Sequence, residues 1–202
     1  MIFAVVVLAG YLLGSCPWGY WLVRVFRHKD IRLVGSGNIG ATNVWRTYGR
    51  TLGLPVIVLD FLKGFAPALV GVLVVSHVCG IAAGAAAMLG HWRPLFLRFA
   101  KGGKMVATAG GVFFAVAPLA ALAGSAIWWA LFLATRYVSV ASIAATLSLP
   151  ALAAALGYPT PVIAFSGFAA LGVLVLHRGN LRRLRAGTEN RARLRRTVRS
   201  SA

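Results

Sequence analysis

Apolar blocks, each about as long as a membrane-crossing helix, alternate with basic segments along the 202 residues of this chain. About 20 apolar residues suffice for an α-helix to cross the hydrocarbon core of a bilayer. Hydrophobic residues make up 59% of the chain and charged residues 12%, whereas a soluble domain carries roughly 25% charged residues. The sequence therefore predicts an all-α integral membrane protein.

We expect seven transmembrane helices. The apolar stretch 105–135 has some 31 residues, and a single helix of that length would measure roughly 46 Å, too long for a core of about 30 Å. Pro118 lies near its middle and is expected to divide it into two helices. The first span is not expected to be a secretory signal peptide, because its basic residues follow the apolar run. The other expected spans are 2–23, 53–75, 78–97, 138–156 and 161–176.

Charge determines the expected orientation. The chain has 21 Lys and Arg residues against three acidic ones, and Lys and Arg concentrate in cytoplasmic loops. With seven spans, the N-terminus outside and the C-terminus cytoplasmic, no basic residue falls in an outward turn; six spans would put Arg136 and the basic tail outside. We therefore expect one transmembrane domain over 1–190 and a basic cytoplasmic tail over 191–202 that contacts anionic lipid. Nucleic acid is not an expected partner, since no basic face with interleaved aromatic residues lies outside the membrane.

Three expected cytoplasmic segments carry the residues that point to a function. The first, 35–46, packs small, hydroxyl and amide residues between two spans. Glycines let backbone N–H groups approach an anion, and a helix beginning near Ala41 would direct its positive end to the same place. This pattern favours a phosphate-binding loop over a flexible polar linker with a helix cap, although its spacing is not that of a P-loop. The candidate ligands are Ser36, Gly37, Asn38, Gly40, Thr42, Asn43 and Arg46.

The second segment has two lysines, Lys101 and Lys104, on either side of Gly102-Gly103. Lysine binds phosphate as a point charge, so all four residues are candidate substrate ligands. The alternative is an ordinary basic loop on the cytoplasmic side. His91, shortly before this segment, is interpreted either as a histidine satisfied at the membrane interface or as part of the same site.

The third segment begins with His177 and Asn180 at the end of the last span and continues to Gly187-Thr188-Glu189. His177 is a candidate general acid or base, or a phosphate donor when protonated. A further pair, Asp60 and Lys63, lies three residues apart on one helix inside the bilayer. Because ionisable groups there are costly and usually paired, we favour a structural ion pair over a direct catalytic role.

Several classes of chemistry are not expected. The chain has three acidic residues, which leaves too few for hydrolysis by paired carboxylates or for a carboxylate-bound magnesium ion. It also lacks a Gly-x-Ser-x-Gly elbow and the His-x-x-x-x-Asp pattern of many acyl-CoA-dependent glycerolipid acyltransferases. Cys16 and Cys79 lie in apolar stretches and suggest no disulfide. The site is cationic and short of bases, which suits a substrate that brings its own phosphates.

Together and in this order, these segments resemble the motifs of the bacterial membrane acyl-phosphate:glycerol-3-phosphate acyltransferases. The resemblance covers residues 1 to about 190 and rests on Ser36–Asn43, on Asp60-x-x-Lys63-Gly64, on His91 with Lys101–Lys104, and on His177-Arg178-x-Asn180 with Gly187–Glu189. Two positions depart from the family pattern. Arg93 stands where an aromatic residue is usual, and Met105 replaces a common glycine and is expected to stiffen the lysine loop.

The resemblance implies transfer of an acyl group from acyl phosphate to sn-glycerol 3-phosphate, which gives 1-acyl-sn-glycerol 3-phosphate and inorganic phosphate, the first step of phosphatidic acid and phospholipid synthesis. It implies a site on the cytoplasmic side of the bacterial plasma (inner) membrane, no metal or other cofactor, and functional coupling to an enzyme that forms acyl phosphate. We expect direct attack by the glycerol hydroxyl, whose proton passes to a phosphate oxygen of the donor. The residues expected to act in catalysis are Ser36, Lys104, His177 and Asn180.

In this interpretation two sets of residues share the two phosphates. Ser36, Asn38, Asn43 and the nearby glycine N–H groups would hold one phosphate. Arg46, Lys101 and Lys104 would hold the other, while His177 and Asn180 orient the reacting groups. The enzyme would then supply proximity and charge stabilisation.

Two alternatives stay open from the sequence. A transporter of a small organic phosphate would also have a cationic inner vestibule, although transporters usually place polar residues at the bilayer midplane and often contain repeats. An acyltransferase that uses acyl-CoA or acyl carrier protein as donor could employ the same scaffold.

Overall fold

The computed structural model describes residues 1–192, and within that range the chain is helical and contains no strand. The predicted all-α fold is thus confirmed. Residues 191 and 192 are described, whereas the rest of the predicted basic tail, 193–202, lies outside the described residues. Two short 3₁₀ turns, η1 (Ile31–Leu33) and η2 (Leu95–Leu97), accompany the α-helices. The α-helices are α1 (Ile2–Gly14), α2 (Trp18–Arg27), α3 (Ala41–Tyr48), α4 (Arg50–Val74), α5 (His77–Trp92), α6 (Val106–Val116), α7 (Pro118–Thr135), α8 (Val138–Ala155), α9 (Thr160–Leu176) and α10 (Arg178–Arg185).

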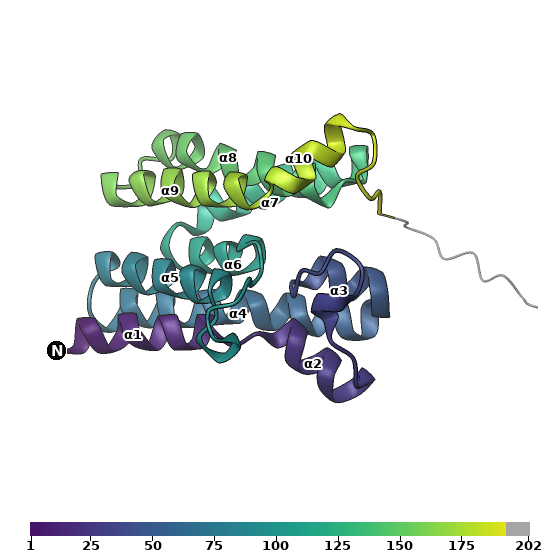
Figure 1. Ribbon diagram of the computed structural model, residues 1–202. Coiled ribbons are helices and arrows are strands. Elements are labelled where there is room, and N and C mark those ends of the chain that lie inside the picture. Colours follow the sequence, from purple (N-terminus) through teal and green to yellow (C-terminus); the bar gives the residue numbers. More distant parts are fainter. Residues whose placement is uncertain (193–202) are drawn as a thin grey trace, which may run out of the picture.

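The long helices run lengthwise and form two layers, with α7 to α10 in one and α1 to α6 in the other (Figure 1). Hydrogen bonds gather three uncharged turns at one end of the bundle. The ring Nε2 of His77 lies 2.8 Å from the carbonyl oxygen of Val116, and the backbone N–H of Leu119 donates to the hydroxyl of Tyr158 over 3.1 Å. The N-terminus lies at this end, while α3 and α10 lie at the opposite one (Figure 1).

Helix boundaries agree with the sequence expectations at Pro118 and Ala41 and differ most in the first and third expected spans. The break at Pro118 is confirmed, since α6 ends at Val116 and α7 begins at the proline, and the predicted helix start at Ala41 is confirmed as well. The expected first span is divided into α1 and α2 around Pro17, which has no N–H to continue the first helix. The expected third span ends at Trp92 instead of residue 97, because the residue before Pro94 is disfavoured in the helical conformation.

Four helical segments of the described chain are long and apolar enough to cross a membrane: 2–27 (α1 with α2), α4, α7 and α8. A fifth results if α9 and α10, which meet at 55°, are counted together. Helix α6 has 11 residues and measures only about 16 Å. The structure thus gives four to five candidate spans by length and composition.

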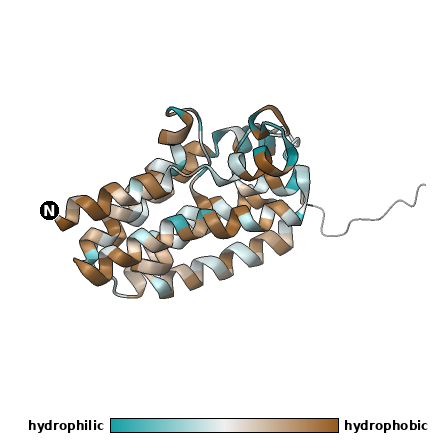
Figure 2. Cartoon of the chain, turned by 90° about the horizontal axis from the view of Figure 1, so that it is seen from below, coloured by the Kyte–Doolittle hydropathy of each residue, from teal (hydrophilic) through white to brown (hydrophobic). Residues whose placement is uncertain are grey.

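Small residues let the helices approach closely, as is usual in membrane bundles. A side chain at Gly64 would overlap the backbone of Thr108, and one at Gly111 would overlap that of Phe61, so that α4 and α6 touch through their main chains. Large apolar side chains such as Phe168, at 76% exposure, face outward instead. In Figure 2 the hydrophilic residues gather at the end away from the N-terminus, while the helices are largely hydrophobic.

Candidate active site

The first predicted loop is held in shape by one buried amide. Asn43, on α3, is 2% exposed, and its Oδ1 accepts a hydrogen bond from the N–H of Ser36 at 2.9 Å. Its Nδ2 donates to the carbonyls of Asn38 at 2.9 Å and Val34 at 3.0 Å. Gly37 within this loop has a φ of 67°, a conformation that favours glycine. The carboxamide of Asn43 therefore serves the loop itself, and its polar atoms are engaged there.

Backbone N–H groups of this loop are also partly used within it. The N–H of Gly37 donates to the carbonyl of Val34, and that of Gly40 donates to Oδ1 of Asn38. The side chain of Ser36 is exposed, as is that of Thr42 in the first turn of α3. The side chains of this loop that remain accessible to an anion accordingly include the hydroxyls of Ser36 and Thr42.

The lysine loop lies directly against the first loop. The Nδ2 of Asn38 donates to the carbonyl oxygen of Gly102 over 3.2 Å. Gly102 and Gly103 are buried, whereas Lys101 is exposed and Lys104 is partly buried. Met105, which follows, has a φ of 68°, the conformation in which glycine is favoured. The first two predicted segments thus meet through a hydrogen bond between residues 64 positions apart.

The third segment joins the site through Lys104. Its Nζ donates to Oδ1 of Asn180, whose Nδ2 in turn donates to Oε1 of Glu189 over 2.6 Å. The same carboxylate accepts hydrogen bonds from the hydroxyl of Ser139 at 2.9 Å and from Nε of Arg183 at 2.7 Å. Burial alone would raise the pKa of Glu189, but these three hydrogen bonds together lower it. Glu189 is therefore ionised, and it holds the side chain of Asn180, which in turn accepts the hydrogen bond from Lys104.

The electrostatics of the site are dominated by positive charge. Burial lowers the pKa of Lys104 to about 8, and the nearby cations Arg183, Lys101 and Arg46 add to this effect against the opposing charge of Glu189. Desolvation likewise lowers the pKa of Arg46, again opposed by Glu189 and assisted by Arg183. Cations that repel one another in a partly buried site are stabilised by an anion, so this arrangement suits a phosphate ligand.

His177 lies at the junction of α9 and α10 and is 4% exposed. Its Nδ1 is 2.8 Å from the carbonyl oxygen of Val173, so Nδ1 must carry the proton and Nε2 is left as an acceptor. Burial first, and then Lys104, lower the pKa of His177 to about 4. In the ligand-free protein the ring is therefore uncharged at neutral pH, and Nε2 is available to accept a hydrogen bond.

The predicted ion pair inside the bundle is present. Nζ of Lys63 lies 2.7 Å from Oδ1 of Asp60, and both residues are at most 5% exposed. Lys63 also donates to the carbonyl oxygen of Cys16 over 2.9 Å. Within residues 1–192 no three His, Cys, Asp or Glu side chains are grouped so that they could hold a metal ion.

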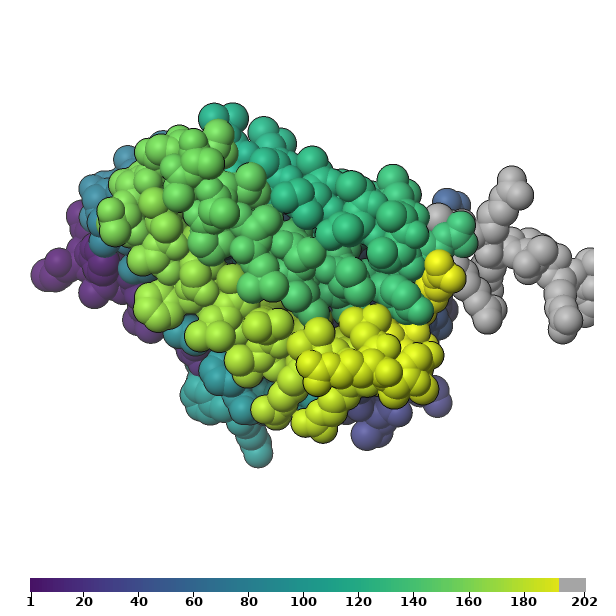
Figure 3. Space-filling model, turned by 90° about the horizontal axis from the view of Figure 1, so that it is seen from above, coloured from purple at the N-terminus to yellow at the C-terminus, as the bar shows by residue number. Residues whose placement is uncertain are grey.

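Glu189 and two of its partners, Ser139 and Arg183, received no individual role from the sequence. Glu189 was part of a quoted motif, but its hydrogen bond to Ser139, 50 positions away, depends on the packing of the last segment against α8. That segment crosses to the α7–α8 turn, where the backbone N–H of Ala192 donates to the carbonyl of Arg136 over 2.8 Å. In Figure 3 it is seen, in yellow, beside the ends of these helices.

The fold and the site define an integral membrane protein with a cationic, hydrogen-bonding site at one end of its helix bundle. The family model for glycerol-3-phosphate acyltransferase matches residues 4–187. A glycerol-3-phosphate acyltransferase of Geotalea daltonii is 47% identical over 187 residues, which cover 92% of this chain and 95% of the relative, and one of Aquifex aeolicus is 45% identical over 188 residues, or 92% and 96%. The chain belongs to the glycerol-3-phosphate acyltransferase family.

A solved structure supports this assignment. The crystal structure of PlsY, an integral membrane glycerol 3-phosphate acyltransferase, in its glycerol 3-phosphate form has a TM-score of 0.92 and 42% identity, and the match covers 96% of each chain. The lysophosphatidic acid form of PlsY matches with a TM-score of 0.87.

Proposed function

We propose that this protein transfers an acyl group from acyl phosphate to sn-glycerol 3-phosphate, releasing 1-acyl-sn-glycerol 3-phosphate and inorganic phosphate. Membership of the family supports glycerol 3-phosphate as the acceptor. The choice of acyl phosphate as donor rests on the chemistry of the site, and the product is the first intermediate of phosphatidic acid synthesis.

The observation that carries this choice is the cationic cluster around Lys104. In addition to burial, the charges of Arg183 and Arg46 lower the pKa of Lys104, that of Arg183 also lowers the pKa of Arg46, and the carboxylate of Glu189 opposes both effects. The histidine of the cluster, His177, is neutral and is too weak a base, at a pKa of about 4, to activate a hydroxyl strongly. Acyl phosphate is a mixed anhydride with a good leaving group, and its reaction does not require such a base.

In the proposed reaction the glycerol hydroxyl attacks the acyl carbonyl carbon, and the bond between that carbon and the phosphate oxygen breaks. The hydroxyl proton passes to an oxygen of the departing phosphate. Nε2 of His177 accepts a hydrogen bond from the attacking hydroxyl and orients it, and Asn180 fixes the ammonium group of Lys104. The cations stabilise the phosphate charge in a site of low dielectric, where such interactions are strongest.

The phosphates are divided between the two loops. Arg46, Lys101 and Lys104 hold one phosphate by charge, and the Ser36 hydroxyl contributes to the other. Asn43 and Asn38 act by holding the loop and by tying it to the carbonyl of Gly102. Both substrates are thereby brought into one geometry, which supplies much of the rate enhancement without an acid–base pair.

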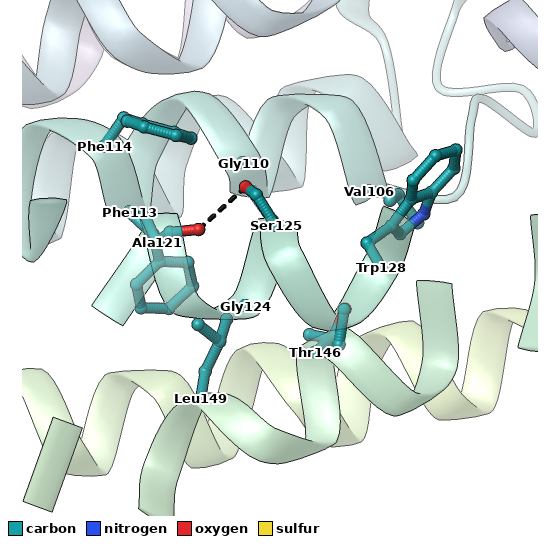
Figure 4. Close-up of a pocket in the computed structure, with 12 residues that line it drawn as sticks. Val106, Gly110, Phe113, Phe114, Ala121, Gly124, Ser125, Trp128, Thr146 and Leu149 are labelled. Carbon is teal, nitrogen blue, oxygen red and sulfur yellow. Dashed lines mark hydrogen bonds between the residues drawn. The ribbon is translucent and has the colours of Figure 1, made fainter. Parts of the chain in front are cut away.

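Apolar space for the acyl chain begins beside Lys104. A cavity of about 150 Å³ lies between α6, α7 and α8, with Val106 and Trp128 at one end and Phe113 and Leu149 at the other (Figure 4). Because Val106 is two residues from Lys104, a chain that enters there extends from the cationic site along α6. A second apolar cavity, of about 270 Å³, is lined by Met105 and by residues of α9. The remainder of the chain would lie in the bilayer.

For topology we propose seven membrane passes, made by α1 with α2, α4, α5, α6, α7, α8 and α9. Successive helices run in opposite directions along the bundle, and the uncharged turns lie together at one end, which supports this arrangement. The positive-inside rule supports an orientation with the basic end and the site in the cytoplasm and the N-terminus outside. The membrane would be the bacterial plasma (inner) membrane, with the acyl phosphate supplied by a coupled enzyme.

The donor is tested with purified, detergent-solubilised protein and glycerol 3-phosphate, using palmitoyl phosphate in one reaction and palmitoyl-CoA in a parallel one. We expect phosphate release that depends on glycerol 3-phosphate and no reaction with palmitoyl-CoA. Turnover of palmitoyl-CoA alone would overturn the choice of donor. Silence with both donors, in protein that still binds glycerol 3-phosphate, would indicate a transporter instead.

A further inference from the structure

A buried charged group lies behind the lysine loop and is not used by the proposed reaction. It consists of Asp60 and Lys63 on α4 and His91 on α5, which are 3%, 5% and 4% exposed. The Nδ1 of His91 lies 3.6 Å from the same Asp60 oxygen that Lys63 approaches to 2.7 Å. This Nδ1 is fully buried and has no hydrogen-bond partner among the described residues. The Nδ1 edge of the ring therefore faces the carboxylate, which attracts it electrostatically.

The opposite edge of the His91 ring supports the backbone of the lysine loop. A Cβ added at Gly103 would overlap the imidazole, with Nε2 as the nearest atom, and the three atoms nearest to that Cβ all belong to this ring. The carbonyl oxygen of His91 accepts the N–H of Gly103 at 3.0 Å, and that of Trp92 accepts the N–H of Gly102 at 2.9 Å. The Gly102-Gly103 backbone thus packs against the C-terminal end of α5 and contacts the imidazole ring of His91.

The position of this glycine pair determines where two hydrogen bonds between the segments of the site lie. The carbonyl of Gly102 accepts the hydrogen bond from Asn38, which belongs to the first loop. Lys104, directly after Gly103, donates to Asn180 of the third segment. A change in the orientation of His91 would move the anchoring points of all three segments.

We propose that His91 and Asp60 are positioning residues for the lysine loop: Asp60 orients the imidazole, and the imidazole sets the Gly102-Gly103 backbone from which Lys104 and the Asn38 contact are placed. This role rests on the proposed function and goes beyond an ion pair that only stabilises the helices. Displacement of a substrate-holding group by about 1 Å can cost on the order of a hundredfold in rate. The effect of altering His91 is therefore expected in substrate binding and turnover of folded protein.

The sharpest test is a double-mutant cycle between His91 and Gly103. Gly103→Ala alone should lower kcat/KM for glycerol 3-phosphate at least about tenfold, because the new methyl group displaces the loop from the ring. In a His91→Ala background the same substitution meets no ring, so that the double variant should match His91→Ala within about twofold. Gly167→Ala is the matched control, since nothing lies within 4 Å of a Cβ at that position, and it should keep wild-type kinetics.

Two further variants separate positioning from general stability. His91→Phe keeps a ring under Gly103 and should recover part of the activity lost in His91→Ala. Asp60→Asn keeps the shape of the side chain and should raise the KM for a phosphate-bearing substrate in protein whose thermal unfolding remains cooperative; it also serves if His91→Ala does not fold. Binding of glycerol 3-phosphate, measured by calorimetry, should weaken in parallel.

Two results would overturn the proposal. One is a Gly103→Ala effect of the same fold size with and without His91. The other is a set of His91 and Asp60 variants in which the melting temperature falls while KM and glycerol 3-phosphate affinity stay at wild-type values. Wild-type turnover is measured first, so that a failure of the proposed function is seen separately from a failure of this inference.

Discussion

Raising the pH from 7 to 9 should remove most of the positive charge of Lys104. A lysine loses its charge as the pH rises through its pKa, and burial lowers this pKa to about 8. The protonated fraction then falls from about nine-tenths at pH 7 to about one-tenth at pH 9. If the charged form is required to bind phosphate, kcat/KM should decrease about tenfold over this range, because kcat/KM reports the pKa of groups in the free enzyme.

Other titrations do not interfere with this assignment. The second pKa of a phosphate monoester is about 6, so the substrate remains a dianion between pH 7 and 9. His177, with a pKa of about 4, is already neutral at pH 7. Of these groups, only Lys104 changes charge in the window.

The assay is the initial rate of phosphate release at subsaturating glycerol 3-phosphate, measured at half-unit pH steps. Lys104→Arg is the control, because a guanidinium stays charged throughout the range. This variant is expected to be less active, since the planar guanidinium group does not fit the contact with Asn180. Its kcat/KM should nevertheless be independent of pH over this range. A flat wild-type profile, or an equal decrease in Lys104→Arg, would refute the reasoning.

Three further predictions concern single side chains. Asn43→Ala removes a buried amide that accepts a hydrogen bond from the Ser36 N–H and should destabilise the loop by about 1–3 kcal/mol. We expect a lower melting temperature and a kcat/KM lowered at least about tenfold. An unchanged rate would contradict this prediction. Thr108→Val replaces a buried hydroxyl that has no hydrogen-bond partner among the described residues, so the melting temperature should stay the same or rise, and a large decrease would count against this expectation. Ser125→Phe fills the cavity of Figure 4, which is the proposed site of the acyl chain. The turnover of palmitoyl phosphate should therefore fall relative to that of decanoyl phosphate. An unaltered ratio of the two turnover rates would exclude this cavity as the acyl site.

Much of the fold was predictable because membrane insertion leaves a strong local signal. The break at Pro118 and the helix start at Ala41 each depend on neighbouring residues alone, and the structure agrees with them. The break before α2 was missed, because the apolar character of 2–23 continues across Pro17 and hides the interruption of the hydrogen-bond pattern.

The site was predictable as three segments but not as a network. Composition indicated the cationic loops, and the hydrogen bonds from Asn38 to Gly102 and from Lys104 to Asn180 bring these segments together. The sequence could not show that the amide of Asn43 bonds to the backbone of its own loop. An asparagine that binds a substrate and one that stabilises a loop look alike in a sequence.

The central claim is tested most directly by Lys104→Ala, measured beside the wild type with palmitoyl phosphate and glycerol 3-phosphate in the same detergent. We predict that phosphate release falls at least about a hundredfold, since a preorganised positive charge that stabilises a substrate phosphate is lost, while the melting temperature changes little. Near-normal turnover by folded Lys104→Ala would contradict the account.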